Sequence, residues 1–184
     1  MEKITFYREW LPLDKKDFRI LALLADKGMF QGNLSDLCRY FSLNPQQRNR
    51  NQIRESIQRL KKAQMIVSEV KGRTYTLRLL PKGKEISIPR TWLETLRRHE
   101  YEGESVSWEA VLKVLLWIIE NQGRITTNNE IAADLRISVS TVVSAKNALD
   151  REYSAITRRK ISKKTGENSF RSIGQELNAS AWWS

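Results

Sequence analysis

TNNEIAADLRISVSTVVSAKNAL, the stretch at residues 127–149, decides the fold that this sequence predicts. It opens with Thr and Asn side chains, either of which can cap a helix over 129–135, and Ser138 can cap a second helix over 139–149. Such side chains accept hydrogen bonds from the unpaired N–H groups at a helix start. Only a short turn that contains Ile137 separates the two helices. The stretch therefore predicts two consecutive helices joined by a tight turn.

The sequence around this stretch predicts the same order of elements in both halves of the chain, namely three helices followed by a β-hairpin. Apolar residues at helical spacing, capping residues and turn residues set the expected limits. The first half is expected to form helices at 17–27, 34–41 and 45–63, the last beginning at Pro45, and strands at 65–70 and 74–79. The second half is expected to form helices at 108–120, 129–135 and 139–149 and strands at 155–161 and 170–173.

The segment from Glu130 to Val142 resembles the helix-turn-helix motif of bacterial DNA-binding proteins. In that resemblance, the small Ala132 lets the two helices approach, and Val142 anchors the second one. Arg136 departs from the motif, which usually has a glycine in the left-handed conformation there. With the hairpin that follows, each half is similar to a winged helix-turn-helix domain, and no single family is indicated. The resemblance implies a mainly α chain with small β-hairpin wings, an α+β fold of two tandem winged helix-turn-helix domains.

The repetition also sets the expected domain limits. They are 1–80 for the first domain, 81–106 for a structured connector, 107–178 for the second domain and 179–184 for a tail. The connector is expected to contain a strand at 86–89 and a helix at 90–98. The aromatic segment at 4–11 is expected to pack either on the first domain or on a second subunit.

The third helix of the first half carries the chemistry of a DNA-reading helix. Between residues 46 and 60 its only apolar residues are Ile53, Ile57 and Leu60, which recur at helical spacing and mark one narrow face. Nearly all the others are Arg, Asn or Gln, which can make paired hydrogen bonds to guanine or adenine in the major groove. An ordinary solvated helix face more often carries Glu–Lys pairs. This pattern favours DNA contact and base discrimination by the first half.

The third helix of the second half offers hydroxyl and methyl groups, which suit phosphate contacts and thymine methyls. Basic residues flank both expected hairpins, where a wing touches phosphates or the minor groove. A charged turn is ordinary by itself, but its place after a helix-turn-helix in both halves favours DNA contact. The candidate DNA-contacting residues are Gln47, Arg48, Asn49, Arg50, Asn51, Arg54 and Gln58 in the first helix, Lys71 and Arg73 in the first hairpin, Ser138, Ser140, Thr141, Ser144, Lys146 and Asn147 in the second helix, and Arg158, Arg159, Lys163 and Lys164 in the second hairpin.

Composition limits the alternatives. The 184 residues carry a net charge of +11, which favours a polyanionic partner but also fits an anionic membrane surface. No apolar run reaches the roughly 20 residues that span a bilayer, and the N-terminus does not begin a signal peptide. We therefore expect a cytoplasmic protein with no membrane partner. With one cysteine, Cys38, and one histidine, His99, we expect no disulfide, metal site or cofactor.

These features predict a sequence-specific double-stranded DNA-binding protein. We favour a transcriptional regulator, because no replication-specific motif accompanies the resemblance. One alternative is a plasmid- or phage-type replication initiator that binds origin repeats. The other is a winged-helix protein-interaction adaptor in replication or segregation, although such adaptors usually lose the basic reading helix. Both a monomer and a homodimer fit the sequence. We expect no enzymatic activity, because the acidic residues are scattered along helix faces.

Overall fold

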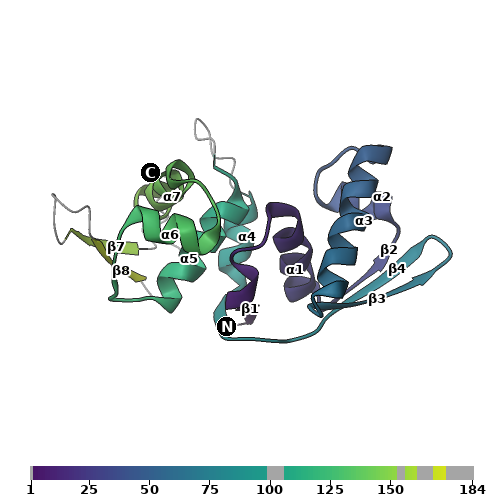
Figure 1. Cartoon of the computed structure of the whole chain (residues 1–184), viewed down its shortest axis with the longest axis horizontal. Coiled ribbons are helices and arrows are strands. Elements are labelled where there is room, and N and C mark those ends of the chain that lie inside the picture. The colour runs from purple at the N-terminus through teal and green to yellow at the C-terminus, as the bar shows by residue number, and fades with distance from the viewer. Residues whose placement is uncertain (1, 99–105, 153–155, 161–167, 173–184) are drawn as a thin grey trace. The chain divides into compact units, whose positions relative to one another are not determined.

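The computed structural model describes residues 2–98, 106–152, 156–160 and 168–172, with side chains for 2–97 and 106–150. The chain has a mixed α+β fold with small antiparallel sheets (Figure 1). It divides into two compact units. One is continuous, Asp14–Lys84, and is called the 14–84 unit below. The other combines Met1–Leu13 with Glu85–Ser184 and is called the terminal unit.

The 14–84 unit contains helices and a three-stranded sheet. In chain order its elements are α1 (Lys15–Lys27), β2 (Met29–Gly32), α2 (Leu34–Tyr40), α3 (Gln47–Lys62), β3 (Ile66–Lys71) and β4 (Thr74–Leu79). The strand order is β2-β4-β3, and both pairings are antiparallel. β4 is therefore the central strand, and the hairpin of β3 and β4 extends past the end of β2 (Figure 1).

Capping residues set the limits of the first two helices. The expected end of the first helix and start of the second are confirmed, but the first helix begins at Lys15, two residues before the expected position 17. The Asp14 side chain accepts two backbone N–H groups of the first turn of α1, and Gly28 ends that helix with a φ of 76°. A side chain with a Cβ is strained at such a φ, which is why a glycine suits this position. Asn33 and Asp36 form a reciprocal capping box at the start of α2.

The core of the 14–84 unit lies between its helices and one face of its sheet. α1 and α3 contact the strands, and α2 packs against α3. The buried apolar residues that fill this space include Phe18, Leu21, Leu24, Leu37, Ile53, Ile57, Leu60, Ile66 and Leu77. Cys38 is also fully buried, and burial raises the pKa of its thiol. The predicted apolar face of α3 thus lies in the core, which leaves its other sides to solvent.

The terminal unit contains two small sheets. Its elements are β1 (Lys3–Tyr7), the 3-10 helix η1 (Arg8–Trp10), β5 (Glu85–Pro89), α4 (Arg90–Arg98), α5 (Trp108–Glu120), β6 (Ile125–Thr126), α6 (Asn128–Leu135), α7 (Val139–Asn147), the π-helical turn η2 (Ala148–Glu152), β7 (Ile156–Lys160) and β8 (Asn168–Ser172). β1 pairs with β5, and the other sheet has the order β6-β8-β7. From α5 onward the unit repeats the order of the 14–84 unit, with a helix, a short strand, two helices and a hairpin.

Pairing of β1 with β5 corrects the expected domain limits. The two strands are antiparallel, from Lys3 opposite Pro89 to Tyr7 opposite Glu85. Residues 1–13 therefore belong with the terminal unit and not with the first domain expected at 1–80. The strand and helix expected in the connector are confirmed as β5 and α4, but they are part of the same compact unit. The tail expected at 179–184 lies outside the described residues.

α5 is the central helix of the terminal unit. Its residues from Ala110 to Ile118 are all buried, on every side of the helix. α4 and β5 contact it, and so do α6, α7 and β8. A helix that is apolar all round is stable only when other elements surround it. The elements β5 and α4 therefore share one core with α6, α7 and β8.

The turns before the third helix of each unit share one backbone geometry. Each contains a left-handed residue, Arg136 with a φ of 52° and Ser42 with a φ of 55°. In each, the next residue, Ile137 or Leu43, donates its N–H to the carbonyl five residues earlier. The expectation that Arg136 adopts the left-handed conformation is confirmed.

The third helices differ in where they begin. The 14–84 unit has five more residues than the terminal unit between this turn and the first buried apolar residue of the helix, Ile53 or Val142. Two of them, Asn44 and Pro45, lengthen the turn, and three extend the start of α3. The prediction that Pro45 begins the helix is wrong, because the chain stays extended as far as Gln46, the N-cap residue. α3 therefore begins almost one turn earlier than α7.

Candidate nucleic-acid interface

One side of α3 carries a continuous row of polar side chains. Gln47, Arg50, Asn51 and Arg54 recur at spacings of three and four residues, which places them on one side of a helix. These four residues are called the α3 stripe below. All of them are exposed or half-buried, and the exposed Gln58 continues the row. The extra turn at the start of α3 supplies one of the four, Gln47.

Hydrogen bonds join the α3 stripe into a ladder. Arg50 Nη2 donates to Gln47 Oε1 at 2.9 Å, and Gln47 Nε2 donates to Asn51 Oδ1 at 2.9 Å. Arg54 Nη1 donates to the same Asn51 oxygen at 3.1 Å. Neutral amide oxygens therefore hold both guanidinium groups, and no carboxylate of the described residues pairs with them. Both charges remain available to an anionic ligand.

The α3 stripe borders a hollow of about 530 Å³. Its lining comes from three places, which are the stripe itself (Gln47, Arg50, Arg54), the β3–β4 hairpin (Gly72, Arg73, Tyr75) and the start and surface of α2 (Asn33, Leu34, Ser35, Arg39). None of these residues is acidic. Arg39 pairs with Asp36 at 3.1 Å, whereas the other three arginines have no such partner among the described residues. Four arginines from a helix, a hairpin and a second helix thus surround one concave surface.

The structure separates the candidates of the first half into three groups. Arg50, Arg54, Gln47 and Arg73 line the hollow, and Asn51 belongs to the ladder beside it. Arg48, Gln58 and Lys71 are exposed but do not line it. Asn49 is on a different side of α3, where its Nδ2 donates to the Asn44 carbonyl at 2.7 Å. The Asn49 side chain therefore holds the preceding turn against the helix, and its contact with DNA stays a prediction.

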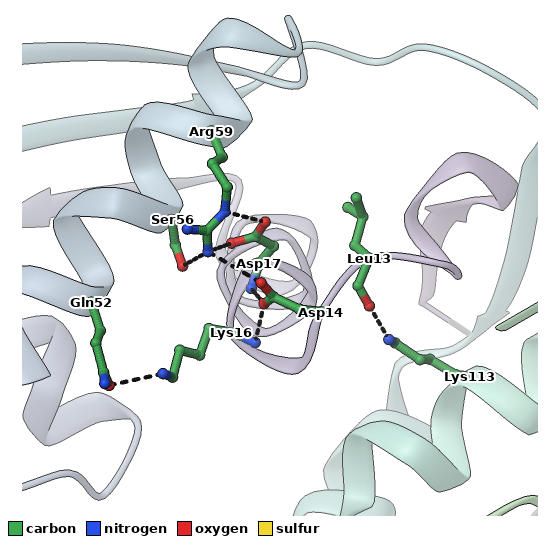
Figure 2. A network of polar contacts seen from close by, with 8 residues as sticks. All are labelled: Leu13, Asp14, Lys16, Asp17, Gln52, Ser56, Arg59 and Lys113. Carbon is green, nitrogen blue, oxygen red and sulfur yellow. Dashed lines mark hydrogen bonds and ion pairs between the residues drawn. The ribbon is translucent and has the colours of Figure 1, made fainter. Parts of the chain in front are cut away.

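A second polar network fixes the flank of α3 against α1 (Figure 2). Arg59 donates from Nε and Nη2 to the two oxygens of the buried Asp17 carboxylate, at 3.1 and 2.8 Å. Its Nη2 also contacts the side chains of Asp14 at 3.1 Å and Ser56 at 2.9 Å. The hydrogen bond to Asp17 raises the pKa of Arg59. Arg59 therefore orients α3 and does not contribute to the hollow.

The exposed face of α7, the corresponding helix of the terminal unit, has a different character. Val139 and Val143 are 41% and 37% exposed, and between them lies the exposed Ser140. Ser138 Oγ lies 2.9 Å from Ser140 Oγ and 2.7 Å from Thr141 Oγ1. This face carries hydroxyl and methyl groups and no charge, as the sequence indicated. The candidates Ser144 and Asn147 are half-buried on the same helix.

Lys146 is the one charged residue of α7, and its role as a DNA contact is contradicted. The residue is only 4% exposed, and its Nζ donates to Asn128 Oδ1 on α6. A buried ammonium must be hydrogen-bonded to remain in the core. Lys146 therefore ties the two helices of the motif together. Sequence spacing could not show this, because the acceptor lies 18 residues away.

The second hairpin is described only in its strands. Arg158 and Arg159 are in β7, opposite Phe170 and Ser169 of β8. Lys163 and Lys164, in the turn between the strands, lie outside the described residues. The backbone therefore places two of the four basic candidates on the hairpin, and the other two stay predictions.

The sequence missed Arg39, Asn33, Ser35 and Tyr75 as neighbours of the α3 stripe. Arg39 is on α2, eight residues before α3 begins, and only the packing of α2 against α3 brings it to the hollow. Tyr75 lines the hollow because it is on β4, next to the turn between β3 and β4. The sequence alone could not show that Arg39 and Tyr75 lie beside the α3 stripe, because their positions depend on how α2 and β4 pack in the tertiary structure.

Other kinds of site receive no support within the described part of the chain. No group of three or more His, Cys, Asp and Glu side chains could hold a metal ion there. No helix in those residues is long and apolar enough to cross a membrane. Comparison of the sequence with protein-family models found no match, and comparison with curated proteins found none either.

Proposed function

We propose that this chain is a sequence-specific double-stranded DNA-binding protein with two winged helix-turn-helix domains. One observation carries the proposal. The α3 stripe, the hairpin residue Arg73 and the α2 residue Arg39 surround one hollow that has no acidic lining residue. The order of helix, short strand, two helices and hairpin in both units also supports it. So does the shared left-handed turn before α3 and α7.

In the proposed complex, α3 enters the major groove with the α3 stripe toward the base edges. Its first turns carry the stripe, and reading helices of this kind contact bases with their N-terminal residues. Arg73 and Lys71 at the hairpin turn then reach the phosphates or the minor groove beside the reading helix. Phosphate contacts supply affinity and position, whereas the stripe supplies sequence preference.

The test is binding of the full chain to a pool of random duplexes, followed by sequencing of the retained DNA. We expect enrichment of a defined motif and loss of that enrichment in the Arg50→Ala, Arg54→Ala double variant. The Lys61→Ala variant is the matched control, because Lys61 is an exposed basic residue of α3 that neither lines the hollow nor belongs to the candidate residues. Recovery of DNA without any motif would contradict sequence-specific reading.

We favour a transcriptional regulator over a replication initiator. A footprint on the DNA around the chain's own gene separates these two roles. Protection of a promoter supports a regulator, and protection of tandem repeats beside a replication gene supports an initiator.

A protein-interaction role is a second candidate for the terminal unit alone. It is favoured by the uncharged exposed face of α7, with Val139 and Val143 on its surface and Lys146 buried. A charged substitution, Val143→Glu, distinguishes the two roles. It should weaken duplex binding if α7 touches DNA, because it places a carboxylate near phosphates. Unchanged duplex binding would favour the interaction role for this unit.

A further inference from the structure

We infer that the α3 stripe selects guanine rather than adenine in the major groove. The inference rests on the proposed function and specifies which bases the 14–84 unit recognises. It starts from the hydrogen-bond ladder, because a side chain can offer a base only the donors and acceptors that the ladder leaves unused.

The ladder consumes most of the acceptor capacity of the stripe. Each amide oxygen has two lone pairs, so Gln47 and Asn51 together have four acceptor positions. Arg50 occupies one on Gln47 Oε1, while Gln47 and Arg54 occupy both on Asn51 Oδ1. Among the described residues no acceptor takes the Nδ2 hydrogens of Asn51, and each guanidinium uses only one of its N–H groups within the stripe. The exposed surface of the stripe is therefore almost entirely made of donors.

Guanine and adenine differ in how well they match such a surface. In the major groove guanine presents two acceptors, O6 and N7, whereas adenine presents one acceptor, N7, and one donor, the N6 amino group. A guanidinium matches guanine with two parallel N–H bonds. Paired recognition of adenine by Asn51 would need its Oδ1 as an acceptor, and the ladder fills that atom twice. Adenine recognition by Asn51 would therefore cost two existing hydrogen bonds, and guanine recognition by either arginine costs none. Gln47 Oε1 keeps the one free acceptor position of the stripe, so Gln47 alone could pair with adenine without loss, whereas both arginines can pair with guanine.

The spacing of the two arginines also fixes the spacing of the guanines. Arg50 and Arg54 are four residues apart on α3, which is about 6 Å along a helix axis. Base pairs are stacked about 3.4 Å apart, so the two side chains reach positions about two base pairs apart. The bound site of the 14–84 unit should contain two G·C pairs at this spacing.

The experiment begins with the motif selected from random duplexes by the full chain and replaces single bases in it by analogues. 7-Deazaguanine removes the N7 acceptor, and inosine keeps O6 and N7 but removes the minor-groove amino group. We expect 7-deazaguanine at either guanine to weaken binding about tenfold, and inosine to leave it within about twofold. 7-Deazaadenine at any adenine opposite the stripe should have no comparable effect.

A charge-preserving variant links the effect to a residue. Arg54→Lys keeps the positive charge but loses the planar pair of donors, so it should lose the guanine preference at one position while its salt dependence stays the same. Lys61→Arg, a charge-preserving change on α3 outside the hollow and outside the candidate residues, should keep both. A motif whose adenines are sensitive to 7-deazaadenine and whose guanines tolerate 7-deazaguanine would overturn the inference and leave the proposed function intact. Failure to bind any duplex would instead refute the proposed function on which the inference rests.

Discussion

Raising the salt concentration tests whether the basic surface is the DNA-binding face. Each phosphate that a cation neutralises contributes about −0.9 to the slope of log affinity against log salt. In the proposed complex Arg50 and Arg54 face the bases, so the cations of the 14–84 unit that remain for phosphates are the exposed Arg39, Lys71 and Arg73. Together they give a slope of about −2.7. The four basic candidates of the second hairpin would bring the slope of the full chain to about −6.

The assay is fluorescence anisotropy of a labelled duplex that carries the selected motif, repeated over a series of salt concentrations. The double variant Lys163→Ala, Lys164→Ala should flatten the slope by about 2 and weaken cognate and random DNA equally, because these lysines are proposed to touch phosphates only. Lys61→Ala is the control for loss of a positive charge elsewhere on α3.

Two results would refute parts of this reasoning. A slope shallower than about −2 would mean that neither basic surface meets the phosphates. A slope near −2.7 that does not change in the Lys163→Ala, Lys164→Ala variant would mean that only the 14–84 unit binds, and the role proposed for the second hairpin would be wrong.

Three further outcomes follow from the polar contacts. Asp17→Asn should lower the free energy of unfolding of the 14–84 unit by about 1–2.5 kcal/mol, because it breaks the paired contact to the half-exposed guanidinium of Arg59. Asp14→Asn should lower the same free energy by less than about 0.5 kcal/mol. Urea unfolding followed by circular dichroism measures both changes. Tryptophan fluorescence is the internal control, because all six tryptophans lie outside residues 14–84. Equal losses of stability in the two variants would contradict the assigned role of Asp17. Hydrogen bonds from Thr127 hold the pKa of Glu130 below its ordinary value of 4.5, so the charged form stabilises the fold above that pH and this stabilisation is lost as the pH falls through the folded pKa. Thermal melting should accordingly show Glu130→Gln less stable than the parent near neutrality and equal to it in acid, and a constant difference would argue against the charged capping box. Lys146→Met should leave duplex affinity and salt slope unchanged, since this lysine is buried, and a flatter slope would show that it reaches DNA after all.

Local signals in the sequence were enough for the helices and for the hairpin strands. Asn33 and Ser138 accept backbone N–H groups at helix starts, as their residue types indicate, whereas α1 starts after Asp14, two residues before the expected position. Arg136 adopts the left-handed conformation that the resemblance required. Capping and turn formation depend on residues within a few positions of each other, so they can be inferred without knowing the tertiary structure.

The short strands β2 and β6 were not predicted, because they have four and two residues and no clear alternation of their own. Each is formed by pairing with the second strand of a hairpin that lies later in the sequence. β2 pairs with β4, and β6 pairs with β8. The same holds for β1, whose partner β5 begins 78 residues after β1 ends, at the register Tyr7–Glu85. Strand pairing joins segments remote in sequence, and a single strand carries little information about its partner.

The candidate site divides in the same way between sequence and tertiary structure. The sequence by itself determined that α3 is an amphipathic helix rich in Arg, Asn and Gln, because its apolar spacing fixes which face is buried. Only the tertiary structure decided that Asn49 holds a turn, that Lys146 is buried against α6, and that Arg39 and Arg73 join the α3 stripe around one hollow. The residue type determines which hydrogen bonds a side chain can donate or accept. The packing of helices and strands determines which partner lies within reach and whether the side chain stays exposed to water.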